Sequence, residues 1–223
     1  MNSIIIVLLL ILVSLLLIYS MYKIYDKRGL YFSLVIMNIM SFILSFKIIK
    51  IFSLNINLGL IPMISIFTII YIIITKYSIK DKKTILSLSL YTNIITSILI
   101  LITNYFIPTV SETISISIKG TFEYNYKILI LYPITILLSQ YIIIKLFNYL
   151  KELQSNIIIN ITLTYITTGL VYTLVFYLIA YINLIDIKNT VFMGVSSFLI
   201  GIIITLLNTL IIDLIFKKKV KKC

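Results

Sequence analysis

The sequence has no histidine, and its single cysteine, Cys223, is the last of 223 residues. Without histidine the chain cannot build a His-based catalytic dyad, a His-ligated haem or a typical zinc site. A lone cysteine forms no disulfide within the chain, and at the last position it lacks the three following residues of a prenylation signal. We therefore expect no metal and no cofactor.

Acidic residues are also scarce, with seven Asp and Glu in the whole chain. No pair of them is spaced for acid–base catalysis. The sequence also contains no P-loop, no glycine-rich phosphate-binding loop and no nucleophile elbow. We therefore expect that the protein is not an enzyme and does not itself hydrolyse ATP.

The sequence is instead rich in apolar residues, at 61% hydrophobic and 12% charged, with a mean hydropathy of +1.16. A soluble domain cannot bury that much hydrocarbon, so the composition predicts an integral membrane protein. The net charge of +12 comes from basic residues at the ends of apolar runs. That arrangement is typical of membrane topology signals, and we expect a lipid bilayer and no nucleic acid as partner.

Seven segments approach the roughly 20 apolar residues that a membrane-spanning helix needs. They are Ile4–Tyr22, Leu30–Ile49, Leu54–Thr75, Thr84–Phe106, Ile128–Phe147, Ile157–Ile182 and Val191–Phe216. The prediction is therefore an all-α, polytopic helical bundle in one domain, residues 1–223. Residues 1–28 would form an extra N-terminal helix and the first inside loop, and residues 29–223 a core of six helices.

The basic residues also predict the orientation of the chain in the cell membrane. With the N-terminus outside and the C-terminus inside, only five of the 19 basic residues lie outside: Lys47, Lys50, Lys119, Lys127 and Lys188. The other 14 lie inside, as the positive-inside rule requires. Six spans with one re-entrant segment would be the alternative.

Four predicted spans place polar residues at helical spacing on one face. These are Asn38, Ser41 and Ser45; Ser89, Asn93, Ser97 and Asn104; Asn160, Thr164, Thr168 and Tyr172; and Gly194, Ser197, Gly201, Thr205 and Asn208. Such faces are costly against lipid, so we expect them to face the bundle interior. Two interpretations remain open: close packing between helices, or a polar cavity that holds a solute.

Single residues inside the spans add to this pattern. Gln140 carries a primary amide at mid-span, which needs a partner helix or a ligand. Pro62 and Pro133 each remove a backbone donor and can kink a helix. Asp213 is the only acid in a predicted span, and we interpret it as paired with the lysines that follow it. The longest loop, Ile107 to Tyr126, contains an alternating stretch that could be a strand or a flap over the bundle mouth.

Short motifs recur in an order that resembles a known family. They are Tyr22-Lys23 with Lys27 and Gly29-Leu30-Tyr31, Lys47 with Ile51-Phe52, Leu58-Gly59, Lys76-Tyr77, Phe106-Ile107-Pro108, Ser139-Gln140-Tyr141 with Phe147, Thr164, Thr173 with Phe176, and Thr209. From about Leu15 to Lys222 the chain resembles the queuosine-precursor transporter family, also called the vitamin-uptake-transporter family. It is similar to the longer form, which has an extra N-terminal helix.

The resemblance also implies where a solute would bind. Where the family carries Asp, Glu, Arg, Asp and Asp, this chain has Tyr71, Thr75, Asn160, Tyr172 and Asn208. A carboxylate is the natural bidentate acceptor for a guanine-like edge, so these changes alter the chemistry of the site. The full set of substrate-binding candidates is Gln140, Ser139, Tyr71, Thr75, Asn160, Thr164, Thr168, Tyr172 and Asn208.

The resemblance implies a membrane transporter of a small solute, either a 7-deazaguanine precursor of queuosine or a vitamin. Two alternatives stay open. The chain could be a membrane subunit or substrate-capture component that works with a separate ATPase module, or a degenerate paralogue that transports nothing. A homo-oligomer is a further possible assembly.

Overall fold

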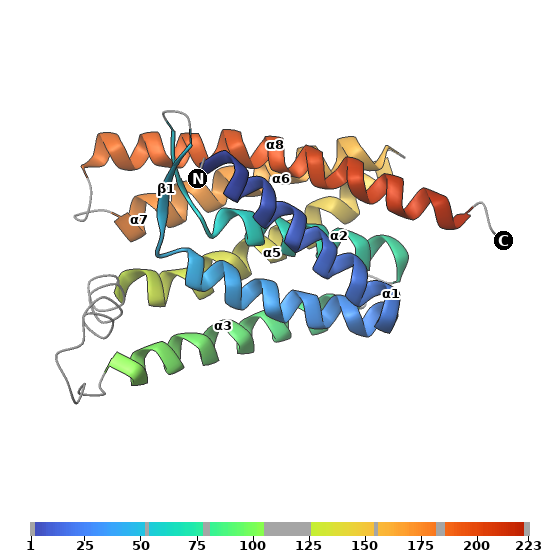
Figure 1. Cartoon of the computed structure of the whole chain (residues 1–223), viewed down its shortest axis with the longest axis horizontal. Coiled ribbons are helices and arrows are strands. Elements are labelled where there is room, and N and C mark those ends of the chain that lie inside the picture. Colours follow the sequence, from blue (N-terminus) through green and yellow to red (C-terminus); the bar gives the residue numbers. More distant parts are fainter. Residues whose placement is uncertain are drawn as a thin grey trace.

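The computed structural model describes residues 3–51, 54–77, 81–104, 126–153, 156–181 and 186–220, with side chains up to residue 209 except those of residues 104, 126 and 157. In these residues the chain is a helical bundle (Figure 1). The predicted strand or flap of the longest loop lies outside the described residues, as do the side chain of Asp213 and Cys223.

The elements follow one another as α1 (Ser3–Leu44), β1 (Ile48–Ile51), β2 (Leu54–Asn57), α2 (Leu60–Lys76), α3 (Lys82–Asn104), α5 (Tyr126–Leu153), α6 (Ile157–Tyr172), the π-helix η2 (Thr173–Tyr177), α7 (Leu178–Tyr181) and α8 (Ile187–Val220). Five helices are long and apolar enough to cross a membrane: α1, α3, α5, the continuous segment from α6 to α7, and α8. The prediction of a membrane protein made of helices is confirmed.

α1 is far too long for one crossing, because 42 residues span about 63 Å, twice the hydrocarbon thickness. The backbone breaks at Asp26, with φ 52° and ψ −126°. Figure 1 shows α1 running away from the N-terminus and then returning beside itself. Gly29 permits this tight reversal, since a Cβ there would lie 1.9 Å from the Met21 carbonyl oxygen. α1 is therefore a helical hairpin of residues 3–25 and 27–44.

α2 is a short helix at the centre of the bundle, in contact with α1, α5 and α8. Figure 1 shows it between α8 and α3. Every residue from Leu60 to Ile74 is buried, as expected of a helix that is apolar on all sides. Pro62 lies in the first turn, where a missing N–H costs little, so it does not kink α2 as the sequence allowed.

The end of the predicted span Leu30–Ile49 and the start of the predicted span Leu54–Thr75 are wrong, because both were expected to be helical. Residues 48–51 and 54–57 form an antiparallel hairpin, with Ile48 paired to Asn57 and Ile51 to Leu54. β2 packs against α8. A short run rich in isoleucine has no periodicity that separates strand from helix, and β-branched residues favour the strand.

Candidate functional site

The polar faces predicted from spacing are turned into the bundle wherever their side chains are described, which excludes Asn104. Asn38, Ser41, Ser89, Asn93 and Thr164 are each fully buried. Large apolar residues on the same helices, such as Ile94 and Ile98 of α3, are about half exposed and face the lipid side. These polar side chains are therefore gathered in the interior of the bundle, in two groups carried by different helices.

The first cluster, here called the amide cluster, joins the second half of α1 to α3 and α5. It consists of Asn38, Ser89, Asn93 and Gln140. Asn38 Oδ1 accepts hydrogen bonds from Asn93 Nδ2 at 3.0 Å and from Gln140 Nε2 at 3.4 Å. Asn38 Nδ2 donates to Ser89 Oγ at 3.2 Å. Gln140 thus has the partner helix that its buried amide was expected to need.

The amide cluster still leaves two acceptors unused. Gln140 Oε1 and Asn93 Oδ1 are buried and have no hydrogen-bond partner among the described residues. A buried polar atom without a partner costs about 1–3 kcal/mol. These two oxygens belong to neighbouring helices and lie beside one hydrogen-bonded network. An N–H donor placed next to them would be stabilised by a hydrogen bond.

The second group, here called the oxygen cluster, is carried by α2, α6 and α8, of which α8 contacts both α2 and α6. It consists of Thr68, Tyr71, Tyr165, Thr205 and Asn208, all at most 3% exposed. Asn208 Nδ2 donates to Thr68 Oγ1 at 3.4 Å. Asn208 Oδ1, Thr205 Oγ1 and the hydroxyls of Tyr71 and Tyr165 have no partner within the described part of the chain.

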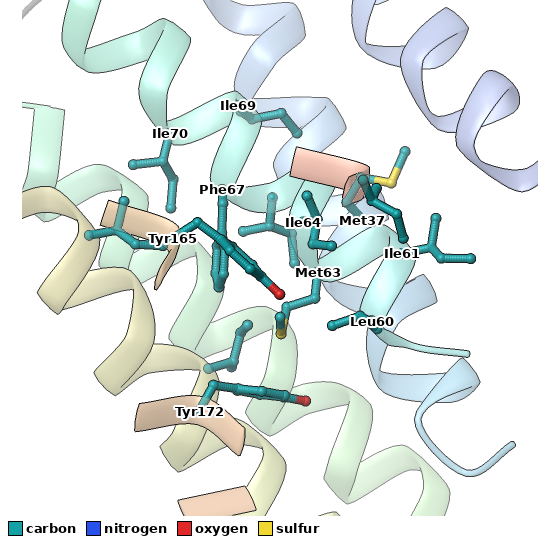
Figure 2. Close-up of a cluster of buried hydrophobic side chains, with 14 of the residues drawn as sticks. Met37, Leu60, Ile61, Met63, Ile64, Phe67, Ile69, Ile70, Tyr165 and Tyr172 are labelled. Carbon is teal, nitrogen blue, oxygen red and sulfur yellow. The ribbon is translucent and has the colours of Figure 1, made fainter. Parts of the chain in front are cut away.

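The two tyrosines of α6 show how this interior is built. Figure 2 shows the hydroxyl ends of Tyr165 and Tyr172 directed toward α2, near Met63. Tyr165 packs so closely on α8 that a Cβ at Gly201 would lie 1.6 Å from its hydroxyl oxygen. Tyr172 instead stacks on Phe176 of the π-helix, with ring centroids 5.1 Å apart.

Several predicted site residues use their hydroxyl groups in hydrogen bonds to the backbone of their own helix. The hydroxyls of Ser139, Thr164, Thr168 and Thr75 each donate to the carbonyl four residues earlier, at 2.6–2.8 Å. This is the ordinary way in which a hydroxyl is accommodated in a membrane helix. Ser139, Thr164 and Thr168 are buried and Thr75 is half-buried, and none of the four hydroxyl protons is free for a solute. Asn160 is buried beside them at the start of α6.

Pro133 does leave a carbonyl free, as predicted, and the structure shows what satisfies it. The carbonyl of Leu129, four residues before the proline, accepts a hydrogen bond from Ser97 Oγ of α3 at 3.0 Å. The same hydroxyl lies 2.9 Å from the Asn93 carbonyl. α3 is therefore tied to α5 beside an apolar groove of ≈ 270 Å³.

One end of the bundle is closed around the β-hairpin. Asn57 Nδ2 donates to the Ser45 carbonyl at 2.6 Å and to the Tyr181 hydroxyl at 2.8 Å. Asn57 Oδ1 accepts from the Gly59 N–H at 2.7 Å. Asn57 thus links the end of α1, the start of α2 and α7 through one side chain.

The other end is closed at the reversal of α1. Lys27 Nζ lies 2.8 Å from Asp81 Oδ1, and the Tyr77 hydroxyl donates to Asp26 at 2.6 Å. The hydrogen bond to Asp81 raises the pKa of Lys27 above its ordinary value. Burial, followed by the bond to Asp26, raises the pKa of Tyr77. These contacts fasten the turn of α1 to the segment between α2 and α3.

Sequence reasoning identified Gln140, Tyr71 and Asn208 as candidates and placed Asn38, Ser89, Asn93 and Thr205 on polar faces, but it missed Thr68 and Tyr165. Thr68 and Tyr165 lie within apolar runs and belong to no polar stripe. Their own polar groups were the only signal in the sequence that they face the interior. Among the described residues, no group of three or more His, Cys, Asp or Glu could hold a metal.

No family model, curated protein or solved structure matches the chain.

Proposed function

We propose that this protein is a small-solute transporter of the cell membrane, with seven crossings, the N-terminus outside and the C-terminus inside. The reversal at Asp26 gives α1 two crossings, and the 17 residues of α2 meet the lower limit for one. α3, α5, the segment from α6 to α7, and α8 supply the rest. The basic turn of α1 then lies inside together with the segment between α2 and α3.

The observation that carries the proposal is the amide cluster at the middle of the bundle. A protein that only needs packed helices gains nothing from two unpartnered amide oxygens there, at a cost of about 1–3 kcal/mol each. A solute that donates N–H groups to Gln140 Oε1 and Asn93 Oδ1 would offset that cost. A nucleobase-like or vitamin-like ring offers such donors.

The closed ends support the same proposal. Asn57 and Tyr181 hold the outer end, and the contacts of Asp26 and Lys27 hold the inner end. A carrier that opens to one side at a time needs two gates of this kind on either side of a binding site. We infer that the structure corresponds to an occluded state.

The proposal includes descent from the queuosine-precursor transporter family. The carboxylates typical of that family are replaced by neutral groups, such as Tyr71 and Asn208. Losing acids and bases together avoids leaving one charge buried alone, which is expensive. The neutral site would then accept N–H donors through amide oxygens.

Uptake tests the proposal. Cells with and without the gene are given a labelled 7-deazaguanine base, then a panel of labelled nucleobases and vitamins. We expect faster uptake of at least one compound with the gene. Gln140→Leu should lower that uptake about tenfold, as the loss of one hydrogen bond to solute predicts.

The matched control is Asn148→Leu, which removes an amide from α5 outside the cluster, where Asn148 donates a hydrogen bond to Glu152 at 3.1 Å. Equal uptake of the deazaguanine with and without the gene refutes that substrate, and equal uptake of the whole panel refutes transport. Wild-type uptake by Gln140→Leu would remove the amide cluster from the mechanism.

A further inference from the structure

Basic side chains gather at the end of the bundle where α1 reverses. Topology signals of this kind act while a chain inserts into the membrane and need no fixed arrangement afterwards. The folded protein nevertheless holds the basic segments 22–28 and 76–83 against each other. Their described residues include six basic and two acidic ones: Lys23, Lys27, Arg28, Lys76, Lys82 and Lys83, and Asp26 and Asp81.

An ion pair sets the arrangement of the two segments. Lys27 Nζ lies 2.8 Å from Asp81 Oδ1, and these two side chains are 36% and 15% exposed. Arg28 follows Lys27 directly and Lys82 follows Asp81 directly, so both start from backbone positions beside the pair. Arg28 and Lys82 are exposed. The pair therefore joins the segments and leaves the next cation on each of them at the surface.

The acidic residues of these segments do not cancel the exposed positive charge. Asp81 is held by Lys27, and its second carboxylate oxygen is buried. Asp26 is exposed and accepts a hydrogen bond from the Tyr77 hydroxyl at 2.6 Å. Four exposed basic side chains, here called the basic surface, outnumber it: Lys23, Arg28, Lys82 and Lys83.

Two less polar side chains beside the basic surface indicate what kind of anion it meets. Ile24 is 66% exposed and Tyr25 is 59% exposed, and both lie between Lys23 and Arg28 in the sequence. A soluble polyanion would leave these two side chains in water. The headgroup region of a bilayer accommodates them, because tyrosine and basic residues favour the interface and isoleucine favours the acyl chains.

The chemistry of the basic residues selects the headgroup. Arginine binds a phosphate through two parallel hydrogen bonds, and lysine adds a point charge. A zwitterionic headgroup carries an ammonium group of its own, which further cations repel. We propose that the basic surface is a binding site for the phosphate headgroup of an anionic phospholipid, which Arg28 of α1 and Lys82 of α3 contact together.

This lipid site does not depend on the transport proposal. In the proposed orientation it lies in the cytoplasmic leaflet, where anionic lipids are concentrated. Lipid binding is measured on the purified protein with no solute present. Lipid binding without uptake refutes only transport, and uptake without a lipid preference refutes only this site.

The test uses the purified, delipidated full-length protein in detergent. Phosphatidylglycerol and phosphatidylcholine with identical acyl chains are added separately, and native mass spectrometry gives the number of bound lipids and the Kd of the first one. Each basic residue near an anionic headgroup strengthens binding about fivefold. With two such residues in contact, we expect the first phosphatidylglycerol to bind about 20-fold more tightly than the first phosphatidylcholine.

Arg28→Gln and Lys82→Gln each remove one exposed charge and leave the ion pair of Lys27 and Asp81 in place. Each should lower the affinity for phosphatidylglycerol about fivefold and leave that for phosphatidylcholine unchanged. The matched control is Lys50→Gln, the same change at an exposed lysine of β1 at the opposite end of the bundle. Equal affinity of the wild type for both lipids, an equal loss in Lys50→Gln, or a loss in only one of Arg28→Gln and Lys82→Gln overturns the proposal.

Discussion

Two glycines of α8 allow the packing between α6 and α8 to be tested with the same substitution at both positions. In Gly201→Ala the new Cβ would lie 1.6 Å from the Tyr165 hydroxyl oxygen and 2.6 Å from its Cζ. Unbonded carbon contacts are comfortable at about 3.5 Å, so the hydroxyl would have to move by roughly 2 Å. Tyr165 cannot do so freely, because it is 1% exposed and stacked on Phe198 at 6.3 Å.

Forcing one extra methyl group into such a packed interior costs about 1–3 kcal/mol. For a chain of this length that corresponds to a fall in Tm of about 5 °C. In Gly194→Ala, two turns earlier, the nearest atom is the Tyr177 Cβ at 3.7 Å, an ordinary contact. Alanine also favours a helix over glycine by about 1 kcal/mol, so this variant should be as stable as the wild type or more stable.

Thermal unfolding of both variants in the same detergent, followed by circular dichroism, gives the comparison. Adding Tyr165→Phe to Gly201→Ala should recover part of the loss, because it removes the closest atom and leaves the ring carbon. If the two alanine variants unfold at the same temperature, the placement of Tyr165 against α8 is wrong.

Three further changes test other contacts, each by Tm. Ser97→Ala should lower Tm by a few degrees, since it strands a proline-freed carbonyl at a cost of about 1–3 kcal/mol, and an unchanged Tm would contradict the α3–α5 bond. Asp26→Gly should be more stable than Asp26→Ala by about 1 kcal/mol. Both variants lose the hydrogen bond from Tyr77, but only glycine tolerates a φ of 52° without strain. The reverse order of Tm would refute the strained turn. The pKa of Lys27 is raised in the folded state, so its ion pair with Asp81 stabilises the protein below pH 10.5 and is lost as the pH rises through the folded-state pKa. The Tm of the wild type should therefore fall above pH 10.5, and the Tm of Asp81→Asn should fall less.

The helices and the inward polar faces could be predicted because both follow from periodicity. Apolar runs of about 20 residues have one stable form in lipid, and a polar stripe at three- and four-residue spacing avoids the acyl chains. Asn38 and Asn93 were placed on interior faces in this way. Their hydrogen bond could not be predicted, because spacing along one helix carries no information about which helix lies opposite.

The prediction of helix for residues 48–51 and 54–57, which form the β-hairpin, was wrong for a different reason. A run rich in isoleucine satisfies the composition of a membrane helix as well as that of a strand, and the choice depends on partners. The reversal of α1 at Asp26 likewise depends on Gly29, whose missing side chain matters only once the two halves lie together.

The central position of α2 in the bundle could not be predicted from its sequence. In water, a helix that is apolar on every side has to be buried, but in lipid the same helix could equally lie at the edge. α2 carries Thr68, which contacts Asn208 of α8, and Tyr71, whose ring packs on Phe147 of α5. Polar residues in an otherwise apolar helix are therefore the signal that distinguishes a buried membrane helix from a lipid-facing one. In α2 that signal is Thr68, whose hydroxyl oxygen accepts a hydrogen bond from Asn208 of α8.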